Sequence, residues 1–356
     1  MKKIFLILSM GLCVNLYATV RTVSNNAGTV AQFTTIQAAV NSSVNGDTIY
    51  VHGSSVQYAG FTITDKRLVV IGPGWSPMQS FAAFPASVAD LSIIGSGSSN
   101  TEIQGLHIVT SVSITSFSHP DNLRFIRNHF GSTVIIGTGT FTYTGYIFES
   151  NWFDGAGLSV PPGCFFTNFL IKNNIFYCAS NNTSASGFFN ATFVIFDHNL
   201  FYGPSIGASN VFGSNCRGLL LTNNIFVRRN AATSNTQCVF NNNITFNAGV
   251  NNPWDAVYGN TGSGNIEGQD PQLVNQAAVN AGTNNPLLDF TIAAGPANNS
   301  GTEGKDLGLL YDAAGSLNWN YSRMSRLPFV YSMNISNPSI PAGGTLSVQV
   351  EARKHN

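Results

Sequence analysis

Three ionisable side chains recur at matching places in this sequence. Glu149, Lys172 and Asp197 each stand two residues before an asparagine, and His198 follows Asp197. A lysine between two carboxylates could act as the base in β-elimination of an acidic polysaccharide, with His198 as the acid. Glu149 and Asp197 would then hold a metal ion or tune the lysine. The simpler interpretation is a surface ion-pair column that contributes ~1 kcal/mol or less per pair.

Further polar side chains flank this column. Arg127 and Asn173, like His198, directly precede an asparagine, and we expect them to point outward as binding groups. Trp152 could stack on a sugar ring, although packing in a core or a loop is the commoner role of tryptophan. These side chains make the densest polar constellation in a chain of which only 9% of residues are charged.

A repeated motif defines these positions. The segment Phe169–Phe176 reads FLIKNNIF, and similar segments read LRFIRNHF, YIFESNWF, VIFDHNLF, LLLTNNIF and, more weakly, CVFNNNIT. When the copies are aligned on one asparagine, they recur at a nearly regular spacing. A period of about 20 to 25 residues predicts a solenoid. The aligned residues are Asn128, Asn151, Asn174, Asn199, Asn224 and Asn243.

Each unit has the pattern of one β-helix coil. Apolar residues stand five and three positions before the asparagine, which predicts a strand with one buried face. A unit of this length is too short for two helices but suits three short strands. We expect the asparagine to sit in a left-handed bend and to bond the next rung, as in other asparagine ladders. Gly105 stands one period before Asn128 and predicts one earlier coil with glycine in the bend.

This pattern resembles the right-handed parallel β-helix, or pectate-lyase-like, superfamily. Phe33–Gly74 resembles the family's opening, with a capping helix at Thr35–Ser43 and a turn at Gly46–Ile49. Gly268–Asn275 and Gly304–Leu310 resemble closing coils of bacterial secreted members. The resemblance implies an all-β, single-stranded, right-handed parallel β-helix. It does not imply one activity, because the superfamily includes lyases, hydrolases, esterases and binding proteins.

The chain divides into three parts. Residues 1–18, with an apolar run at Ile4–Val14, are typical of a signal peptide, so we expect a secreted protein, extracellular, at the cell surface or periplasmic. Residues 19–316 form the predicted β-helix, with an insertion at about 75–100. Residues 317–356 form a C-terminal extension that contains strands.

Charge and length restrict the partners. Loss of Lys2 and Lys3 with the signal peptide leaves 14 basic and 16 acidic residues. No long basic run occurs, which excludes nucleic acid as an expected partner. No membrane span is expected after the signal is removed, since its apolar run is short. A polysaccharide or a surface protein is the expected partner, and calcium is expected only if the chain is a lyase.

Cysteine and histidine give weak signals. Cys216 and Cys238 lie close to one period apart, so they could form a disulfide in an exported protein; a buried free thiol at Cys238 is an equal alternative. Cys164 and Cys178 could pair as well, and the sequence cannot choose. No zinc spacing occurs. The other histidines share no ligand spacing and are expected to be structural: His52, His107, His119 and His129.

One aliphatic residue stands four positions before each asparagine and is expected to point outward. A monomer rarely leaves such a strip bare, so we expect the extension, the insertion or a partner to cover it, with intramolecular cover favoured. The strip comprises Ile147, Leu170, Ile195, Leu220 and Val239.

Three functions fit these observations. The leading hypothesis is a non-catalytic surface protein that binds a glycan or another protein along the coil face. The alternative is a polysaccharide lyase-like enzyme centred on Lys172. The third is a structural component of a surface assembly that uses the aliphatic strip.

Overall fold

The computed structural model describes residues 18–76, 84–115, 117–155, 157–179, 183–206, 210–213, 216–232, 237–311, 317–324, 329–335 and 343–353. The predicted signal peptide, apart from its last residue, lies outside these residues, as does the middle of the predicted insertion.

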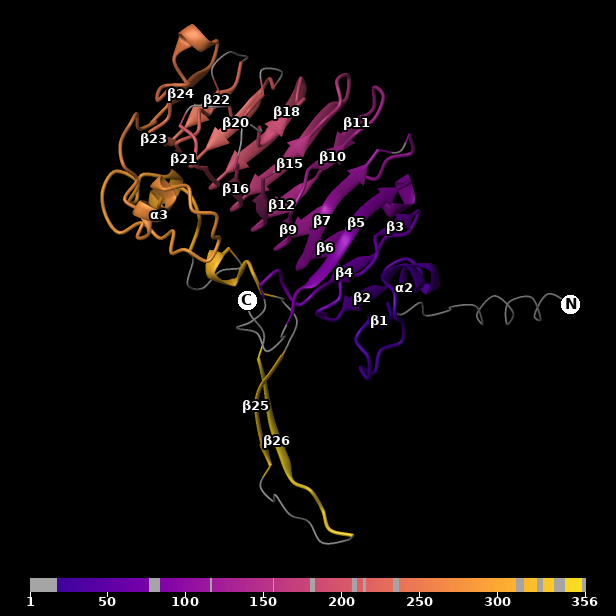
Figure 1. Cartoon of the computed structure of the whole chain (residues 1–356). Coiled ribbons are helices and arrows are strands. Elements are labelled where there is room, and N and C mark those ends of the chain that lie inside the picture. Colours follow the sequence, from indigo (N-terminus) through magenta and orange to yellow (C-terminus); the bar gives the residue numbers. More distant parts are fainter. Residues whose placement is uncertain are drawn as a thin grey trace, which may run out of the picture.

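The chain folds as an all-β parallel solenoid of about 8 turns, which confirms the predicted fold class (Figure 1). Two sheets run along it. Sheet A contains, in spatial order, β1 (Val20–Val23), β2 (Thr48–Val51), β4 (Val69–Ile71), β6 (Glu102–Gln104), β8 (Arg124–Ile126), β12 (Ile147–Glu149), β15 (Phe165–Lys172), β18 (Asn190–Asp197), β20 (Leu219–Thr222), β22 (Val239–Asn241) and β24 (Thr261–Ser263), with β11 (Thr142–Thr144) beside β15. Every neighbouring pair along this order is parallel.

Sheet B covers the rest of the coil. Its spatial order is β17 (Ala185–Ser186), β14 (Leu158–Ser159), β10 (Val134–Ile136), β7 (Leu106–Ile114), β9 (His129–Phe130), β13 (Trp152–Asp154), β16 (Ile175–Tyr177), β19 (Leu200–Tyr202), β21 (Ile225–Val227) and β23 (Ile244–Phe246), with β3 (Phe61–Thr64) and β5 (Ala86–Ile94) joined to β7.

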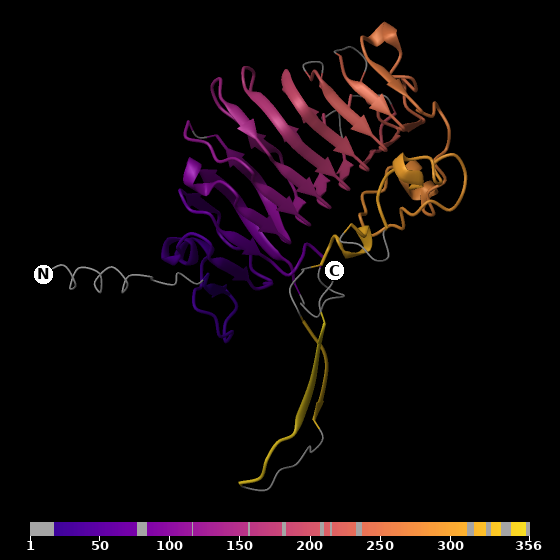
Figure 2. The same cartoon turned by 180° about the vertical axis from the view of Figure 1, so that it is seen from behind.

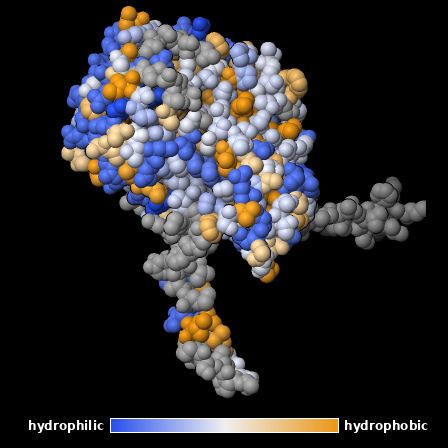
Figure 3. Space-filling view, in the orientation of Figure 1, coloured by the Kyte–Doolittle hydropathy of each residue, from blue (hydrophilic) through white to orange (hydrophobic). Residues whose placement is uncertain are grey.

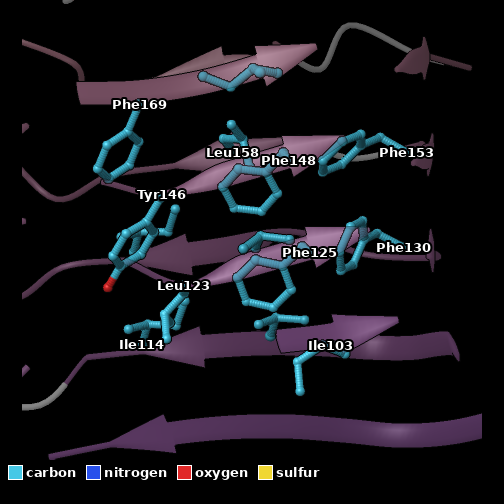
Figure 4. Close-up of a cluster of buried hydrophobic side chains, with 14 of the residues drawn as sticks. Ile103, Ile114, Leu123, Phe125, Phe130, Tyr146, Phe148, Phe153, Leu158 and Phe169 are labelled. Carbon is cyan, nitrogen blue, oxygen red and sulfur yellow. The ribbon is translucent and has the colours of Figure 1, made fainter. Parts of the chain in front are cut away.

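The interior is filled by stacked aromatic rings, at the positions that the repeat predicts. The residues five and three places before each asparagine are at most 4% exposed. Phe153 and Phe176 stack with ring centroids 4.3 Å apart, and Phe176 stacks on Phe201 at 4.8 Å. In Figure 4 the rings of Phe125, Phe148 and their neighbours lie one above another between the strands.

The asparagines form a continuous ladder of hydrogen bonds. Asn174 Oδ1 accepts from Asn151 N at 2.8 Å and from Asn151 Nδ2 at 3.0 Å. Asn174 Nδ2 donates to Phe148 O at 2.9 Å and to Asn199 Oδ1 at 3.0 Å. The other asparagines repeat this pattern, and Asn265 adds a rung that the motif did not reveal.

The bend lies one residue earlier than predicted. The left-handed residue is the one before each ladder asparagine, for example Asn173 at φ 57°. The asparagine itself points inward and is fully buried. Gly105 is also shifted: Gln104 pairs with Ile126, so Gly105 at φ 60° matches Arg127 rather than Asn128.

The first coil is capped as the sequence indicates. Helix α2 (Ile36–Ser42) begins after Thr35, whose side chain accepts from Ala38 N at 3.2 Å. Its buried face comprises Ile36, Ala39 and Val40, which close the end of the core. In the following turn, buried Asp47 accepts from Thr19 N at 2.8 Å.

The predicted insertion at 75–100 is largely a regular coil. Strand β5 pairs with β3 and β7, because every second residue in most of its length is apolar and buried. The short 3-10 helix η2 (Ser96–Ser98) then leads into β6. The prediction of an insertion was therefore wrong for residues 84–100, which belong to the coils.

After its last coil the chain turns back along the solenoid. Ile266 makes the last bridge to sheet B, with Ile244. The described residues of 267–324, here called the return segment, then run along the outer face of sheet B towards its first coils (Figure 2). This segment holds α3 (Gln276–Asn280) and the 3-10 helices η4 (Thr302–Gly304) and η5 (Trp319–Tyr321). Gly268–Asn275 and Gly304–Leu310 are thus not closing coils, as expected, but parts of this covering layer.

The return segment buries a second apolar core against sheet B. Its apolar residues include Leu273, Phe290 and Trp319, and Trp319 reaches Trp75 with ring centroids 6.5 Å apart. Tyr202 Oη adds a hydrogen bond to Thr283 O at 3.1 Å. The return segment therefore covers the outer face of sheet B, whereas the outer face of sheet A stays open to solvent.

The C-terminal extension contains an antiparallel hairpin of β25 (Phe329–Ile335) and β26 (Val348–Arg353). The hairpin stands away from the solenoid (Figures 1 and 2), and Figure 3 shows hydrophobic surface on it. Ile335 is 47% exposed and Val350 is 51% exposed. No helix among the described residues is both long and apolar enough to cross a membrane.

Candidate functional site

The best candidate is an open groove of about 350 Å³ on the outer face of sheet A, here called the sheet A groove. Strands β15, β18 and β20 form its floor, and the return segment forms its far wall. Its lining residues are Leu170, Lys172, Ile195, Asp197, His198, Leu220, Thr222, Asn223, Thr302 and Lys305.

The floor has an apolar and a polar half, because the strands align in register. Leu170, Ile195 and Leu220 pair across β15, β18 and β20 and bring the aliphatic strip together. Two residues further along the same strands, the polar column runs beside it. The strip is half-buried at these three positions, and Val239 at its end is 36% exposed. The expected cover by the extension or the insertion is wrong for the described residues, which leave the strip open as a groove floor.

The polar half is organised around Asp197. Lys172 Nζ lies 2.8 Å from Asp197 Oδ2. Thr222 Oγ1 and Asn223 Nδ2 each donate to Asp197 Oδ1 at 2.8 Å. Burial alone would raise the pKa of Asp197, but His198, Lys172 and Asn223 together outweigh it and lower this pKa. Both carboxylate oxygens are therefore occupied, and Glu149 follows in register on β12 beside Lys172.

His198 is buried rather than outward, with 3% of its surface exposed. Its Nδ1 lies 3.6 Å from Asp197 Oδ1. Burial lowers the pKa of His198 to about 4; Asp197 opposes this effect, while Lys172 and Lys305 add to it. The imidazole is therefore neutral at pH 7, and a neutral imidazole is a much weaker general acid than imidazolium.

The column before the ladder asparagines is buried from Arg127 to Asn223, which corrects the expected outward positions of Arg127 and Asn173 as well. These residues adopt left-handed backbone and turn under the return segment. Asn173 Oδ1 accepts from Leu310 N at 2.7 Å, and Asn223 Oδ1 accepts from Thr302 N at 2.9 Å. The column therefore anchors the return segment. The residues are Arg127, Ser150, Asn173, His198 and Asn223.

Trp152 does not line the groove but lies on the outer face of sheet B. It stacks on His129 at 3.9 Å between ring centroids and contacts Trp75 at 5.3 Å. His129 in turn stacks on His107 at 4.0 Å. His107 and His129 pair in register one coil apart, and this spacing in the sequence could have revealed the stack. The cluster packs the solenoid against Trp319.

Of the two alternatives for Cys238, the structure has the buried thiol: no disulfide joins it to Cys216, and all four cysteines of the solenoid are buried outside any disulfide. The coil here is short. Leu220 pairs with Val239, which places Cys238 beside Leu219 instead of Cys216. Burial raises the pKa of Cys216 to about 12, so its thiol is unreactive at neutral pH.

A second cavity of about 380 Å³ lies within the return segment. It is lined by Thr291, Asn299, Lys305, Asp306, Leu309, Leu310 and Tyr311. Lys305 lines both spaces, so the two are neighbours. Among the described residues, no group of three or more His, Cys, Asp or Glu side chains is placed to hold a metal ion.

The buried histidine makes stability depend on pH. The pKa of His198 is about 4 in the folded chain against 6.5 as its ordinary value, so the unfolded chain binds a proton that the folded chain does not. The contribution of His198 is complete above pH 6.5 and is lost as pH falls towards 4. His198→Asn copies Asn173 and Asn223 of the same column and has no such group to protonate. As pH falls from 6.5 to 4, we expect the free energy of unfolding of wild type to drop by up to ~3 kcal/mol more than that of His198→Asn.

Urea unfolding of both proteins at pH 7 and pH 4 measures this difference. His119→Asn is the matched control, because the side chain of His119 lies outside the buried column. Parallel loss of stability in wild type and His198→Asn would mean that His198 is protonated without cost in the folded chain.

The groove offers an ammonium, a carboxylate, hydroxyl and amide groups opposite an aliphatic floor, and so it can hold an amphipathic ligand. The sequence located the floor and the column but not the wall that Thr302 and Lys305 supply. No protein-family model matches this chain, and a search of curated proteins finds no match.

Proposed function

We propose that this chain is a secreted protein of the pectate-lyase-like superfamily that binds a glycan in the sheet A groove without cleaving it. The observation that carries the proposal is the division of one groove into an aliphatic floor and a polar side. The Asn ladder, the capping helix and the parallel coils support the superfamily assignment.

A sugar ring has the same division. Its ring carbons present C–H groups on the faces, and its hydroxyls point outward as donors and acceptors. Leu170, Ile195 and Leu220 can receive a ring face, while Lys172 and Thr222 can bond the hydroxyls. The volume of about 350 Å³ falls within the usual range for small-ligand sites, and the open ends allow a chain to continue beyond the groove.

The contacts within the groove favour binding over β-elimination. A lysine that removes a proton must be neutral, whereas Lys172 is engaged as an ammonium with Asp197. Asp197 is saturated by three donors, and His198 is buried and neutral at pH 7. Three of the four groups on which a lyase mechanism would draw, Lys172, Asp197 and His198, are thus committed to holding the groove together.

The test is calorimetric titration of the mature chain with hexasaccharides of neutral and acidic sugars. We expect Leu220→Asp to weaken binding at least about tenfold, because it puts a charge on the floor where a ring face would lie. Lys305→Ala should weaken binding less, through loss of the far wall. Ile135→Asp is the matched control: Ile135 is 36% exposed on β10, outside the groove, and the change should leave binding unaltered.

Mass spectrometry of the same mixtures tests the absence of cleavage. Unsaturated oligosaccharides that disappear with Lys172→Ala would replace the binding proposal with a lyase. Equal binding by wild type and Leu220→Asp would move the site away from this groove.

A further inference from the structure

Phe193 stands out within β18, because it combines a left-handed backbone with an exposed aromatic ring. Its φ is 54°, and 70% of its surface is exposed. A large side chain is rarely found at positive φ, and such outliers concentrate at functional sites.

The neighbouring coils show what this position ordinarily holds. It lies six residues before the ladder asparagine, and at that place all the other coils of the repeat also have positive φ. Glycine and asparagine, which tolerate this conformation, predominate there. The equivalents are Asn122, Gly145, Asn168, Gly218 and Gln237, with φ between 56° and 77°. Phe193 is therefore the one aromatic residue at this bend among the six coils, and four of the other five use glycine or asparagine.

The position of Phe193 relates it to the groove. It precedes Ile195 by two residues and Asp197 by four on the same strand. Ile195 pairs with Leu170 and with Leu220 on the floor of the sheet A groove. Phe193 thus lies at the bend directly before the part of β18 that carries the floor, and its exposed ring is two residues from Ile195.

We propose that Phe193 contacts the ligand directly, by stacking on the face of a pyranose ring that extends beyond the groove floor. This inference rests on the proposed function. It adds a selection rule for the ligand: the sugar has equatorial hydroxyls, as in β-1,4-linked glucose or xylose. Both faces of such a ring carry C–H groups, which suit a phenyl ring and an aliphatic floor.

A sugar with an axial hydroxyl fits this surface less well. In α-1,4-linked galacturonate, an axial oxygen would point at Phe193 or at the floor. That oxygen would lose its bonds to water and gain none from carbon atoms, which is unfavourable. The surface should therefore bind β-1,4-linked chains of glucose or xylose more tightly than α-1,4-linked galacturonate.

Phe193→Asn tests the role by giving this coil the residue that the preceding coil has, Asn168. The midpoint of thermal unfolding should rise by about 2–4 °C, since the backbone strain is relieved. Binding of cellohexaose or xylohexaose should weaken at least about tenfold. Phe193→Trp should retain binding, because it keeps an aromatic face. A residue with only a structural role would not move stability and affinity in opposite directions.

The matched control is Phe165→Asn. Phe165 is 46% exposed at the start of β15 and has ordinary strand backbone, so neither quantity should change appreciably. If wild type binds and Phe193→Asn binds equally well, the role of Phe193 is refuted while the groove stands. Equal affinity for hexagalacturonate and cellohexaose would refute the selection rule. If wild type binds none of the three hexasaccharides, the inference and the proposed glycan function fail together.

Discussion

Replacing Asn174 with alanine should lower the free energy of unfolding by at least about 3 kcal/mol, a loss expected at any internal rung of the ladder. Its amide joins three coils. Asn174 Oδ1 satisfies Asn151 N at 2.8 Å, and Asn174 Nδ2 satisfies Phe148 O at 2.9 Å. Alanine would leave these backbone groups buried without partners, in a place where the stacked rings admit no water.

Asn265→Ala is the matched control for this prediction. Asn265 makes the same kind of contacts to Asn243, but it ends the ladder and is only half-buried. Water can replace part of what alanine removes, so the loss should be about 1 kcal/mol. Chemical unfolding of the two variants gives both values. If Asn174→Ala lowers the free energy of unfolding no more than Asn265→Ala does, the ladder does not stabilise the coils and only follows from their stacking.

The repeat explains why so much of the interior could be predicted from the sequence. Whether a residue at an inward position of the motif is buried depends on two things only. These are the alternation of its own strand and the equivalent residue of the next coil, which stacks on it. Phe176 stacks between Phe153 and Phe201 because all three occupy the same place in the repeat. Local spacing therefore carried this information completely.

The covering of the outer faces could not be predicted in this way. The repeat alone predicts that Asn173 and His198 face water, yet both are buried, and Asn173 accepts a hydrogen bond from Leu310 N of the return segment. The separation of Asn173 from Leu310 is 137 residues, and no period links them. The wall of the groove at Lys305 was missed for the same reason. The misalignment of Cys216 and Cys238 has a different reason: one coil is shorter than its neighbours, so Cys238 lies beside Leu219.

The difference between the two outer faces leads to the second large effect. Leu220 and Ile225 belong to one coil, on β20 and β21, and both point away from the interior. Leu220 is half-buried in the open groove, whereas Ile225 is fully buried beneath the return segment. The backbone of Gly308 lies against Ile225, because a Cβ at Gly308 would fall 2.5 Å from Ile225 Cδ1. Gly308 N also donates to Asn223 O at 2.8 Å.

Aspartate at these two positions should therefore have different consequences. Ile225→Asp places a carboxylate in a dry apolar contact, which should cost about 4 kcal/mol or detach the return segment from sheet B. Leu220→Asp leaves its carboxylate in water and should cost about 1 kcal/mol or less. Limited trypsin digestion separates the two outcomes at Ile225. The side chain of Lys305 is already exposed, but its carbonyl accepts from Gly301 N, and detachment would free this backbone for cleavage while the coils stay resistant.

Thermal unfolding of the two variants and wild type completes the comparison. A large loss at Ile225 with rapid cleavage after Lys305 identifies the return segment as a docked layer that is less stable than the solenoid it covers. A large loss at Leu220 would carry a different meaning. It would show that the aliphatic floor is covered in solution, and a groove that is covered cannot be the place where a glycan binds. The same substitution that tests affinity thus also tests whether the groove is open.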